Sequence, residues 1–142
     1  MKDKVFIDTN IFVYAFLDTD DNIQHAKHLK AVDFLKRFGT DNPVTISTQV
    51  LSEYYSALLK NKISDADIQE SAEQLVNSIE VVPVSIHTVM ESYSIKNKYH
   101  YSYWDSLIVT SALQNNCTVI YSEDMQHNQK IENQLSIINP FL

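Results

Sequence analysis

Four acidic residues lie beside strongly apolar segments of the chain, at Asp8, Glu53, Asp105 and Asp124. Clustered carboxylates repel one another unless protons or a divalent cation compensate their charge, and Mg²⁺ and Mn²⁺ prefer oxygen ligands. Metal sites built from oxygen alone suit phosphodiester hydrolysis, in which the metal activates water and offsets charge on the leaving oxygen. If the fold brings the four acids together, metal-assisted hydrolysis is the chemistry that they would support.

Each of these acids also has an ordinary structural interpretation, and two of them lie on predicted helices. At about 100° per residue, Glu53 projects away from the apolar stripe of its predicted helix, beside Ala57, which is typical of a solvated face. Asp105 follows Ser102 at the spacing of a capping box, with Asp in place of the usual Glu or Gln. From their local sequence alone, a solvated Glu53 is favoured and a capping Asp105 is as reasonable as a metal ligand.

The other two acids follow apolar runs that read as strands. Asp8 should stand at the carboxyl end of the strand over residues 5–7, although Asp8 and Asn10 could equally cap a short helix from Ile11 to Leu17. Asp124 follows the run at 119–121, with Ser122 two residues earlier, and an acid in such a turn needs no special function. In open α/β sheets this strand edge is where ligands bind. The combination of the four acids is therefore more informative than any one of them.

Several other kinds of site have no motif in the chain. The sequence contains no Cys/His spacing for zinc, no HExxH, no GxxxxGK[ST] loop and no GxGxxG fingerprint. The segment Asp8-Thr9-Asn10 lacks the second aspartate of a D-x-D nucleophile loop, which disfavours a phosphotransferase or phosphatase.

Short β-branched runs alternate with longer segments of helical spacing. Predicted strands cover 5–7, 44–46, 79–84, 119–121 and 137–138, and predicted helices cover 11–17, 23–38, 49–62, 65–78, 88–98 and 103–116. The buried stripe of the helix at 23–38 is assigned to Ala26, Leu29, Val32 or Ala31, Leu35 and Phe38. Such alternation implies parallel βαβ units in a three-layer α/β/α fold.

Composition limits the classes of protein that the chain can form. A length of 142 residues with 44% hydrophobic and 20% charged residues predicts one globular domain over residues 1–142. We expect no membrane segment and a cytoplasmic location, since no apolar run is long enough and no signal peptide is recognisable. The single cysteine, Cys117, is interpreted as a buried hydrophobe. A net charge of −7 disfavours a protein that simply coats nucleic acid, because the overall field repels a polyanion. It is compatible with an enzyme whose acids surround a cation, since a bound metal reverses the local charge.

Four segments resemble, in order, the conserved blocks of PIN-domain ribonucleases. They read FIDTNIFVYAF, SEYYSAL, SYWDSLIVTSA and YSEDM, and they span most of the chain. Within that superfamily the sequence looks most like VapC-type toxins of type II toxin–antitoxin pairs. The D-T-N block together with W-D-S makes the resemblance fairly specific.

The resemblance implies a mainly parallel sheet of about five strands and a Mg²⁺- or Mn²⁺-dependent endoribonuclease. It implies the catalytic quartet Asp8, Glu53, Asp105 and Asp124, supported by Asn10 and Ser122. Asp8, Asp105 and Asp124 would be metal ligands, and Glu53 would act directly or through water. Glu123, next to Asp124, could replace or supplement that ligand, although the motif favours Asp124. The resemblance also implies an RNA substrate, a small antitoxin and a homodimer.

Two alternatives stay open at this point. One is a PIN-type nuclease of RNA maturation or decay, or one that acts on structured DNA, and the other is a catalytically silent PIN scaffold that binds RNA or a protein. RNA would need local positive charge, and the candidates are Lys27, Lys30, Lys36, Arg37, Lys60, Lys62, Lys96 and Lys98. Tyr99, Tyr101, Tyr103 and Trp104 could include a base-stacking surface. For Trp104 we favour packing in the core or in a dimer, because it adjoins an apolar helix.

Overall fold

Val5, Phe6 and Ile7 form the central strand of the sheet, and all three side chains are buried. The computed structural model describes residues 3–142, so residues 1 and 2 of the expected domain lie outside the described residues. The strands are β1 (Val5–Ile7), β2 (Val44–Ser47), β3 (Glu80–Val82), β4 (Val119–Tyr121), β5 (Lys130–Ile131) and β6 (Leu135–Ile138). The helices are α1 (Thr9–Phe16), α2 (Asn22–Leu35), α3 (Thr48–Lys60), α4 (Asp65–Ser78), α5 (Ile86–Tyr99) and α6 (Tyr103–Gln114).

The strands form one sheet in the order β3-β2-β1-β4-β6-β5. All neighbouring pairs are parallel except β5 and β6, which are antiparallel. Val5 pairs with Val44 on one side and with Val119 on the other, so β1 lies between two parallel neighbours. A strand with that position is covered on both faces, which explains why its three residues are all apolar.

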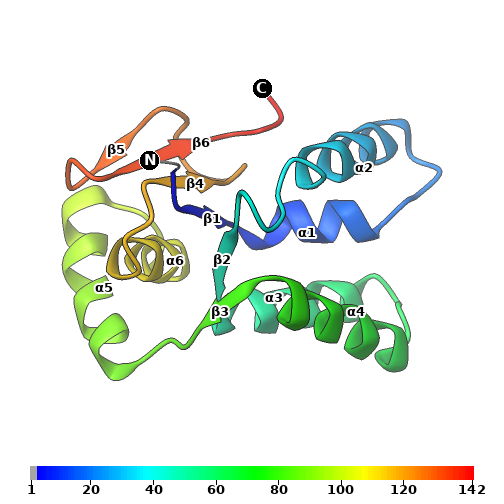
Figure 1. Cartoon of the computed structure of the whole chain (residues 1–142), viewed down its shortest axis with the longest axis horizontal. Helices are drawn as coiled ribbons and strands as arrows, with labels where there is room; N and C mark the ends of the chain where they lie inside the picture. Colours follow the sequence, from blue (N-terminus) through cyan, green and yellow to red (C-terminus); the bar gives the residue numbers. More distant parts are fainter. Residues whose placement is uncertain (1–2) are drawn as a thin grey trace.

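Helices flank the strands in two groups. Figure 1 shows α5 and α6 together on one side of the sheet, and α1, α2, α3 and α4 on the other. Several helix starts are fixed by short polar side chains, as expected for N-caps. Asp21 accepts hydrogen bonds from the amides of Ile23 and Gln24, and Ser64 accepts one from the amide of Asp67. The three-layer, mainly parallel α/β fold predicted from the sequence is confirmed.

The observed elements differ from the expected ones in a few places. The sheet has six strands because β5, only two residues long, adds an antiparallel edge that no periodicity could reveal. The helix expected from Ile11 begins at Thr9, since Asp8 caps it. The expected strand at 79–84 is confined to β3.

The buried face of α2 was assigned correctly at Ala31, one of the two alternatives given, and wrongly at other positions. Ala31 and Phe34 are the buried side chains of this helix, and Leu29, placed in the expected stripe, is 54% exposed. Leu35 and Phe38 are only partly buried against the core. α2 packs mainly on α1, and Phe34 also contacts the ring of Tyr121 on β4. Its contact face is therefore narrow, and the spacing of apolar residues did not fully define it.

Two further observations concern the core and membranes. Cys117 is fully buried and unpaired, as expected, and burial raises the pKa of its thiol to about 11. Within residues 3–142, none of the helices combines the length and apolar character that a transmembrane span requires.

Candidate active site

The parallel pairing of β1 with β4 brings two distant parts of the chain together at one sheet edge. Ile7 lies opposite Tyr121, and the amide of Asp8 donates to the carbonyl of Tyr121 at 2.9 Å. The residues that follow, Asp8 and Ser122, therefore lie side by side. The Ser122 hydroxyl donates to Asp8 Oδ2 at 2.8 Å, and it accepts a hydrogen bond from the amide of Asp124 at 3.2 Å.

Asp8 has both of the roles that the sequence left open. Its Oδ1 atom accepts a hydrogen bond from the amide of Thr9 at 2.7 Å, which caps α1. The carboxylate also lines a cleft at the carboxyl edge of the sheet. Only 6% of the residue is exposed, so its orientation is fixed by the strand, the cap and Ser122.

Glu53 is held over the same cleft and does not point freely into solvent, contrary to its local interpretation. The hydroxyl of Thr9 donates to Glu53 Oε1 at 2.7 Å, and Gln49 Nε2 donates to Oε2 at 3.2 Å. Gln49 Nε2 also donates to the carbonyl of Trp104 at 3.0 Å, so one buried amide links Glu53 to the first turn of α6. The sequence did not single out Thr9 or Gln49, because their importance depends on contacts between separate elements.

Asp105 and Asp124 complete the acidic set. The amide of Asp105 donates to Ser102 Oγ at 3.1 Å, so Asp105 lies in the capped first turn of α6, and its side chain also lines the cleft. Asn10 Nδ2 donates to Asp124 Oδ2 at 2.6 Å, which places the predicted supporting amide between α1 and the end of β4.

The structure thus brings the four acids and Asn10 together, and Ser122 lies buried beneath them. The cleft has a volume of about 370 Å³. Its lining consists of Asp8, Thr9, Asn10, Glu53, Ser56, Ala57, Lys60, Asn61, Asp105 and Asp124.

The electrostatics of the cleft disfavour ionised carboxyl groups. The pKa of Asp8 is raised from 3.8 to about 7. Burial is the main cause, hydrogen bonds from Ser122 and Thr9 oppose the rise, and the charges of Asp105 and Glu53 add to it. Burial, followed by the charge of Asp124, also raises the pKa of Asp105. The pKa of Asp124 is raised by burial and then by Glu123. A site with these shifts favours protons or a cation.

Glu123 points to a different part of the molecule. It forms an ion pair with Lys27 on α2, and Lys27 also lies over the ring of Tyr14, 4.9 Å from its centroid. Glu123 does not line the cleft, whereas Asp124 does. The two adjacent acids are therefore separated in space, and Asp124 is the one that faces the other three.

The donor set is compatible with a magnesium-like cation. Within residues 3–142, no three Asp, Glu, His or Cys side chains are gathered closely enough to form a metal-ligand group by themselves. Mg²⁺ usually keeps several waters and binds through one or two carboxylates plus substrate phosphates, so it does not require such a group. Carboxylate oxygens whose pKa values are raised by burial and by one another are suitable ligands for a hard cation.

Residues 5–131 match the PIN domain family. The chain belongs to this family. No sequence among curated proteins matches the chain at a significant level. The PIN fold of the chain is similar to several solved structures, all below 20% sequence identity, which therefore establish the fold alone.

Three of the similar solved structures come from bacteria, and two of them are described as a toxin and a toxin–antitoxin complex. Mycobacterium tuberculosis VapC20, described as a toxin that cleaves the sarcin–ricin loop, aligns with a TM-score of 0.70 and 18% identity, covering 85% of this chain and 90% of its own. A toxin–antitoxin complex from Klebsiella pneumoniae aligns with a TM-score of 0.70 and 14% identity over 96% and 98% of the two chains. VapBC2 from Rickettsia felis, bound to a DNA fragment from its promoter, aligns with a TM-score of 0.64 and 19% identity, covering 95% of this chain and 98% of its own.

Proposed function

We propose that this protein is a Mg²⁺- or Mn²⁺-dependent endoribonuclease and the toxin of a toxin–antitoxin pair. The observation that carries the proposal is the convergence of Asp8, Glu53, Asp105 and Asp124 on one cleft from four separate segments. A scaffold without catalytic function would have no need to keep four acids together against their mutual repulsion. Membership of the PIN family and the likeness to a toxin that cleaves the sarcin–ricin loop support RNA as the substrate.

In this proposal Asp8, Asp105 and Asp124 would hold the cation, and Glu53 would contribute directly or through water. When bound, the cation would supply a nucleophile at neutral pH and would offset negative charge on the leaving oxygen. Water attacks the phosphorus in line with the bond to the 3′ oxygen, and that bond breaks. The water loses one proton and the 3′ oxygen gains one, so the products are a 3′ hydroxyl and a 5′ phosphate.

The chain's own contribution to this reaction is orientation of the acids. Ser122 fixes Asp8, Asn10 fixes Asp124, and Thr9 with Gln49 fixes Glu53. The contacts from Ser122, Asn10 and Thr9 join different segments of the chain, and the contact from Gln49 lies within α3, so the carboxylates need little rearrangement when a cation binds.

Two variants test the catalytic assignment. Asp8→Asn and Asp105→Asn should each abolish Mn²⁺-dependent cleavage of RNA while circular dichroism shows a folded protein. Asp20→Asn, an exposed acid before α2, is the matched control and should cleave like the wild type. Cleavage by the wild type should stop when a chelator is added. Metal-dependent cleavage retained by either folded variant would refute the assignment.

Two further measurements separate the proposal from its alternatives. Isothermal titration with Mn²⁺ distinguishes an enzyme from a silent scaffold, because a scaffold would give no binding. Sequencing of RNA ends after brief expression of wild type beside Asp8→Asn distinguishes a toxin from a maturation enzyme. A toxin should generate new ends at recurring sites in cellular RNA, and a small reading frame should adjoin its gene.

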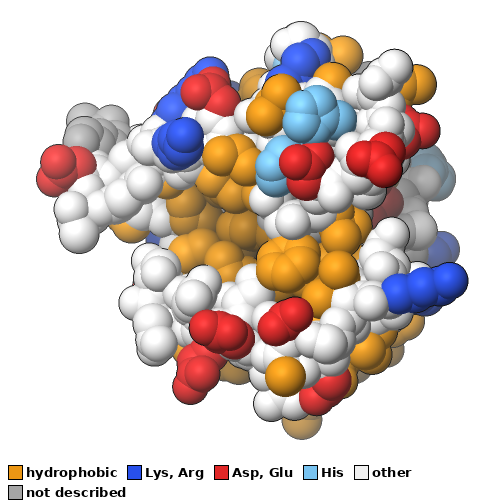
Figure 2. All heavy atoms as spheres, turned by 90° about the vertical axis from the view of Figure 1, so that its right-hand side faces the viewer, with side chains coloured by type: hydrophobic (Ala, Val, Ile, Leu, Met, Phe, Trp, Pro, Cys, Tyr) orange, Lys and Arg blue, Asp and Glu red, His pale blue; other side chains and the backbone are white. Residues whose placement is uncertain are grey.

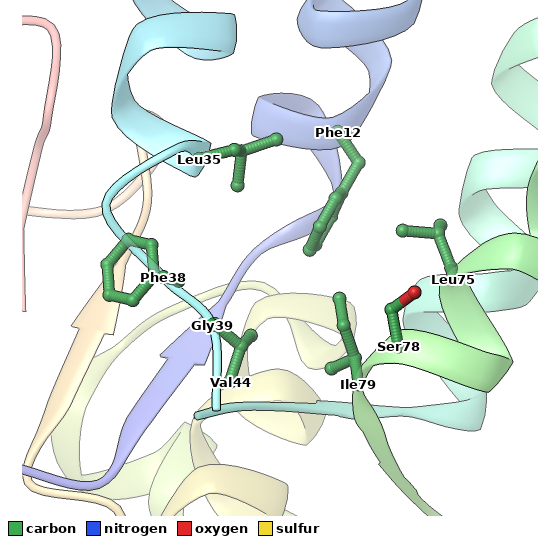
Figure 3. A pocket seen from close by; sticks show the side chains of 8 residues that line it. All are labelled: Phe12, Leu35, Phe38, Gly39, Val44, Leu75, Ser78 and Ile79. Atoms are coloured by element: carbon green, nitrogen blue, oxygen red, sulfur yellow. The ribbon is translucent and has the colours of Figure 1, made fainter. Parts of the chain in front are cut away.

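An apolar groove supports a protein partner for the toxin. It lies between α1, α2 and the end of α4, has a volume of about 240 Å³, and shares no lining residue with the acidic cleft. Figure 2 shows hydrophobic side chains in a hollow on this side of the molecule, between the α1–α2 and α3–α4 groups. In Figure 3, Phe12 of α1, Leu35 of α2 and Leu75 of α4 lie around it. Phe38 and Ile79, from the segments that follow α2 and α4, also line the groove. We propose that an apolar segment of the antitoxin binds here.

Substitution in the groove tests this placement of the antitoxin. Leu75→Glu should weaken binding of the polypeptide encoded by the adjacent small reading frame, because it puts a charge among apolar side chains. Val76→Glu, the next residue and 49% exposed, is the control. RNA cleavage should be unchanged in both variants. Equal binding by the two variants would exclude the groove.

A second exposed apolar face supports the proposed homodimer. Ile86, Met90 and Tyr93 lie at helical spacing along α5 and are 83%, 59% and 47% exposed. We expected Trp104 to pack in the core or in a dimer; it is 61% exposed, so the core alternative is wrong. The ring of Tyr103 lies between those of Trp104 and Tyr93 and contacts both. Sedimentation should give a dimer for the wild type and a monomer for Met90→Glu. A monomeric wild type would refute the proposed homodimer.

A further inference from the structure

Lys60 is the one Lys or Arg among the residues that line the acidic cleft, within the part of the chain that the structure describes. The other basic candidates of the sequence are placed elsewhere. Lys27 pairs with Glu123, Lys98 pairs with Glu132, and neither lines the cleft. The Lys60 side chain is exposed and forms no ion pair with any residue in the range 3–142. Its charge therefore remains available to an anion.

The position of Lys60 follows from the helical period of α3. Glu53, Ser56, Ala57 and Lys60 stand at i, i+3, i+4 and i+7, so one stripe of the helix forms a wall of the cleft. Seven residues at a rise of about 1.5 Å separate Glu53 from Lys60 by about 10 Å along the helix axis. This separation explains why Lys60 does not neutralise the acids although it shares their cleft.

We propose that Lys60 binds a backbone phosphate of the RNA that flanks the scissile phosphate. The inference rests on the proposed function and extends it to the path of the substrate along α3. A net charge of −7 and four acids in the cleft repel a polyanion, so a cation at one end of the cleft would reduce the cost of bringing RNA to the acids. Ser56 and Asn61 add neutral polar groups beside it.

A structural role for Lys60 must be separated from this one. Lys60 lies in the last turn of α3, where any cation interacts favourably with the helix dipole. Lys62, two residues later, carries the same charge at the same end of the helix but does not line the cleft. Lys60→Gln and Lys62→Gln thus form a matched pair that removes one charge each, and Lys60→Arg tests whether a cation suffices.

RNA binding is measured in the Asp8→Asn background, which prevents cleavage, by fluorescence anisotropy with a short single-stranded oligoribonucleotide at several salt concentrations. Lys60→Gln should weaken binding about two- to five-fold, the range for one exposed ion pair. The slope of log affinity against log salt concentration should fall by about 0.7, the value for one phosphate contact on a single strand. Lys62→Gln should leave both quantities unchanged, and Lys60→Arg should restore them.

Two readouts on an otherwise wild-type background complete the test. In RNA cleavage, Lys60→Gln should raise KM and leave kcat unchanged, because the contact binds ground state and transition state equally. In Mn²⁺ titration without RNA, Lys60→Gln should bind the cation about two-fold more tightly, since a positive charge about 10 Å away has been removed. A residue that only completes the helix would change neither KM nor metal affinity.

The outcomes separate this inference from the proposed function. If the wild type cleaves RNA but Lys60→Gln and Lys62→Gln have the same salt slope and KM, Lys60 is not a phosphate contact and the nuclease assignment stands. If the wild type neither binds Mn²⁺ nor cleaves, the proposed function fails. In that case a loss of salt slope confined to Lys60→Gln would still identify an RNA-binding residue.

Discussion

The burial of Asp8 gives a quantitative prediction about stability. Without a cation, the ionised carboxylate is held in a site that disfavours its charge, and its pKa is about 7 in the folded protein against 3.8 for an ordinary aspartate. Between these two values the folded state binds a proton that the unfolded state has released. The free energy of unfolding is therefore highest when Asp8 is protonated and falls as the pH rises from about 4 through about 7.

The magnitude follows from the separation of the two pKa values. A ten-fold difference in proton affinity is worth about 1.4 kcal/mol, so the separation between 3.8 and about 7 corresponds to a loss of up to about 4 kcal/mol. Asp8→Asn removes the ionisable group. Its side-chain oxygen can still accept from the Thr9 amide, and its amide can donate to Ser122 Oγ, so both hydrogen bonds have replacements.

We therefore expect Asp8→Asn to be more stable than the wild type at about pH 8, by up to about 4 kcal/mol, and nearly equal to it at about pH 4. The assay is urea denaturation of both proteins across this pH range in the presence of a chelator. Asp20→Asn, at an exposed position, should follow the wild type at every pH. Addition of Mn²⁺ at about pH 8 should stabilise the wild type by about 2.7 kcal/mol at one hundred times its Kd, and Asp8→Asn by much less.

The refuting result is a folded Asp8→Asn protein that is no more stable than the wild type at about pH 8 and has the same dependence on pH. Such a result would mean that the carboxylate is well solvated or well compensated without a cation. The argument that the acidic cleft favours protons or a metal would then fail for Asp8, although the hydrogen bonds around it would be unaffected.

Three further predictions concern the supports of the site and the core. Ser122→Ala should lower the free energy of unfolding by about 1.5–3 kcal/mol at about pH 8, because the buried Asp8 carboxylate loses a hydrogen-bond donor, and by less at about pH 5. Urea denaturation at both pH values measures this difference. Ser122→Thr, which keeps the hydroxyl, should behave like the wild type. Lys27→Met should lower the free energy of unfolding by about 1–3 kcal/mol, because Glu123 loses its ion-pair partner. In a double-mutant cycle, adding Glu123→Gln should recover part of this stability. Ile137→Ala, at a fully buried position of β6, should cost about 2–5 kcal/mol in thermal or urea unfolding, and a cost below about 1 kcal/mol would contradict the packing described.

The sequence determined much of the fold because local rules act on neighbouring residues. The periodicity of α4 predicted Asp65–Ser78 with the observed bounds, since Ser64 caps one end and the apolar spacing is regular. The runs at 5–7 and 119–121 were correctly predicted as strands for the same kind of reason. Local rules could not predict β5, because a strand of two residues is defined by its pairing with β6 and not by its composition.

The sequence also named the acids of the cleft, and it could do so because each lies at a strand end or in the first turns of a helix. It could not decide between cap and cleft for Asp8, or between a solvated face and the cleft for Glu53. Those choices depend on the register of β1 with β4 and on Thr9 contacting α3 from another element. The structure placed Asp8 in both roles.

Other features were decided by tertiary structure alone. Trp104 adjoins an apolar segment in sequence, but it is 61% exposed, because it lies in the first turn of α6 and the buried part of this helix begins only at Ser106. Glu123 and Asp124 are neighbours in the chain, and only the position of Lys27 on α2 directs one away from the cleft and leaves the other in it. The availability of Lys60 likewise depends on which side chains lie within reach. Composition and periodicity specify elements, whereas the partners of a charged side chain are specified only when those elements are packed together.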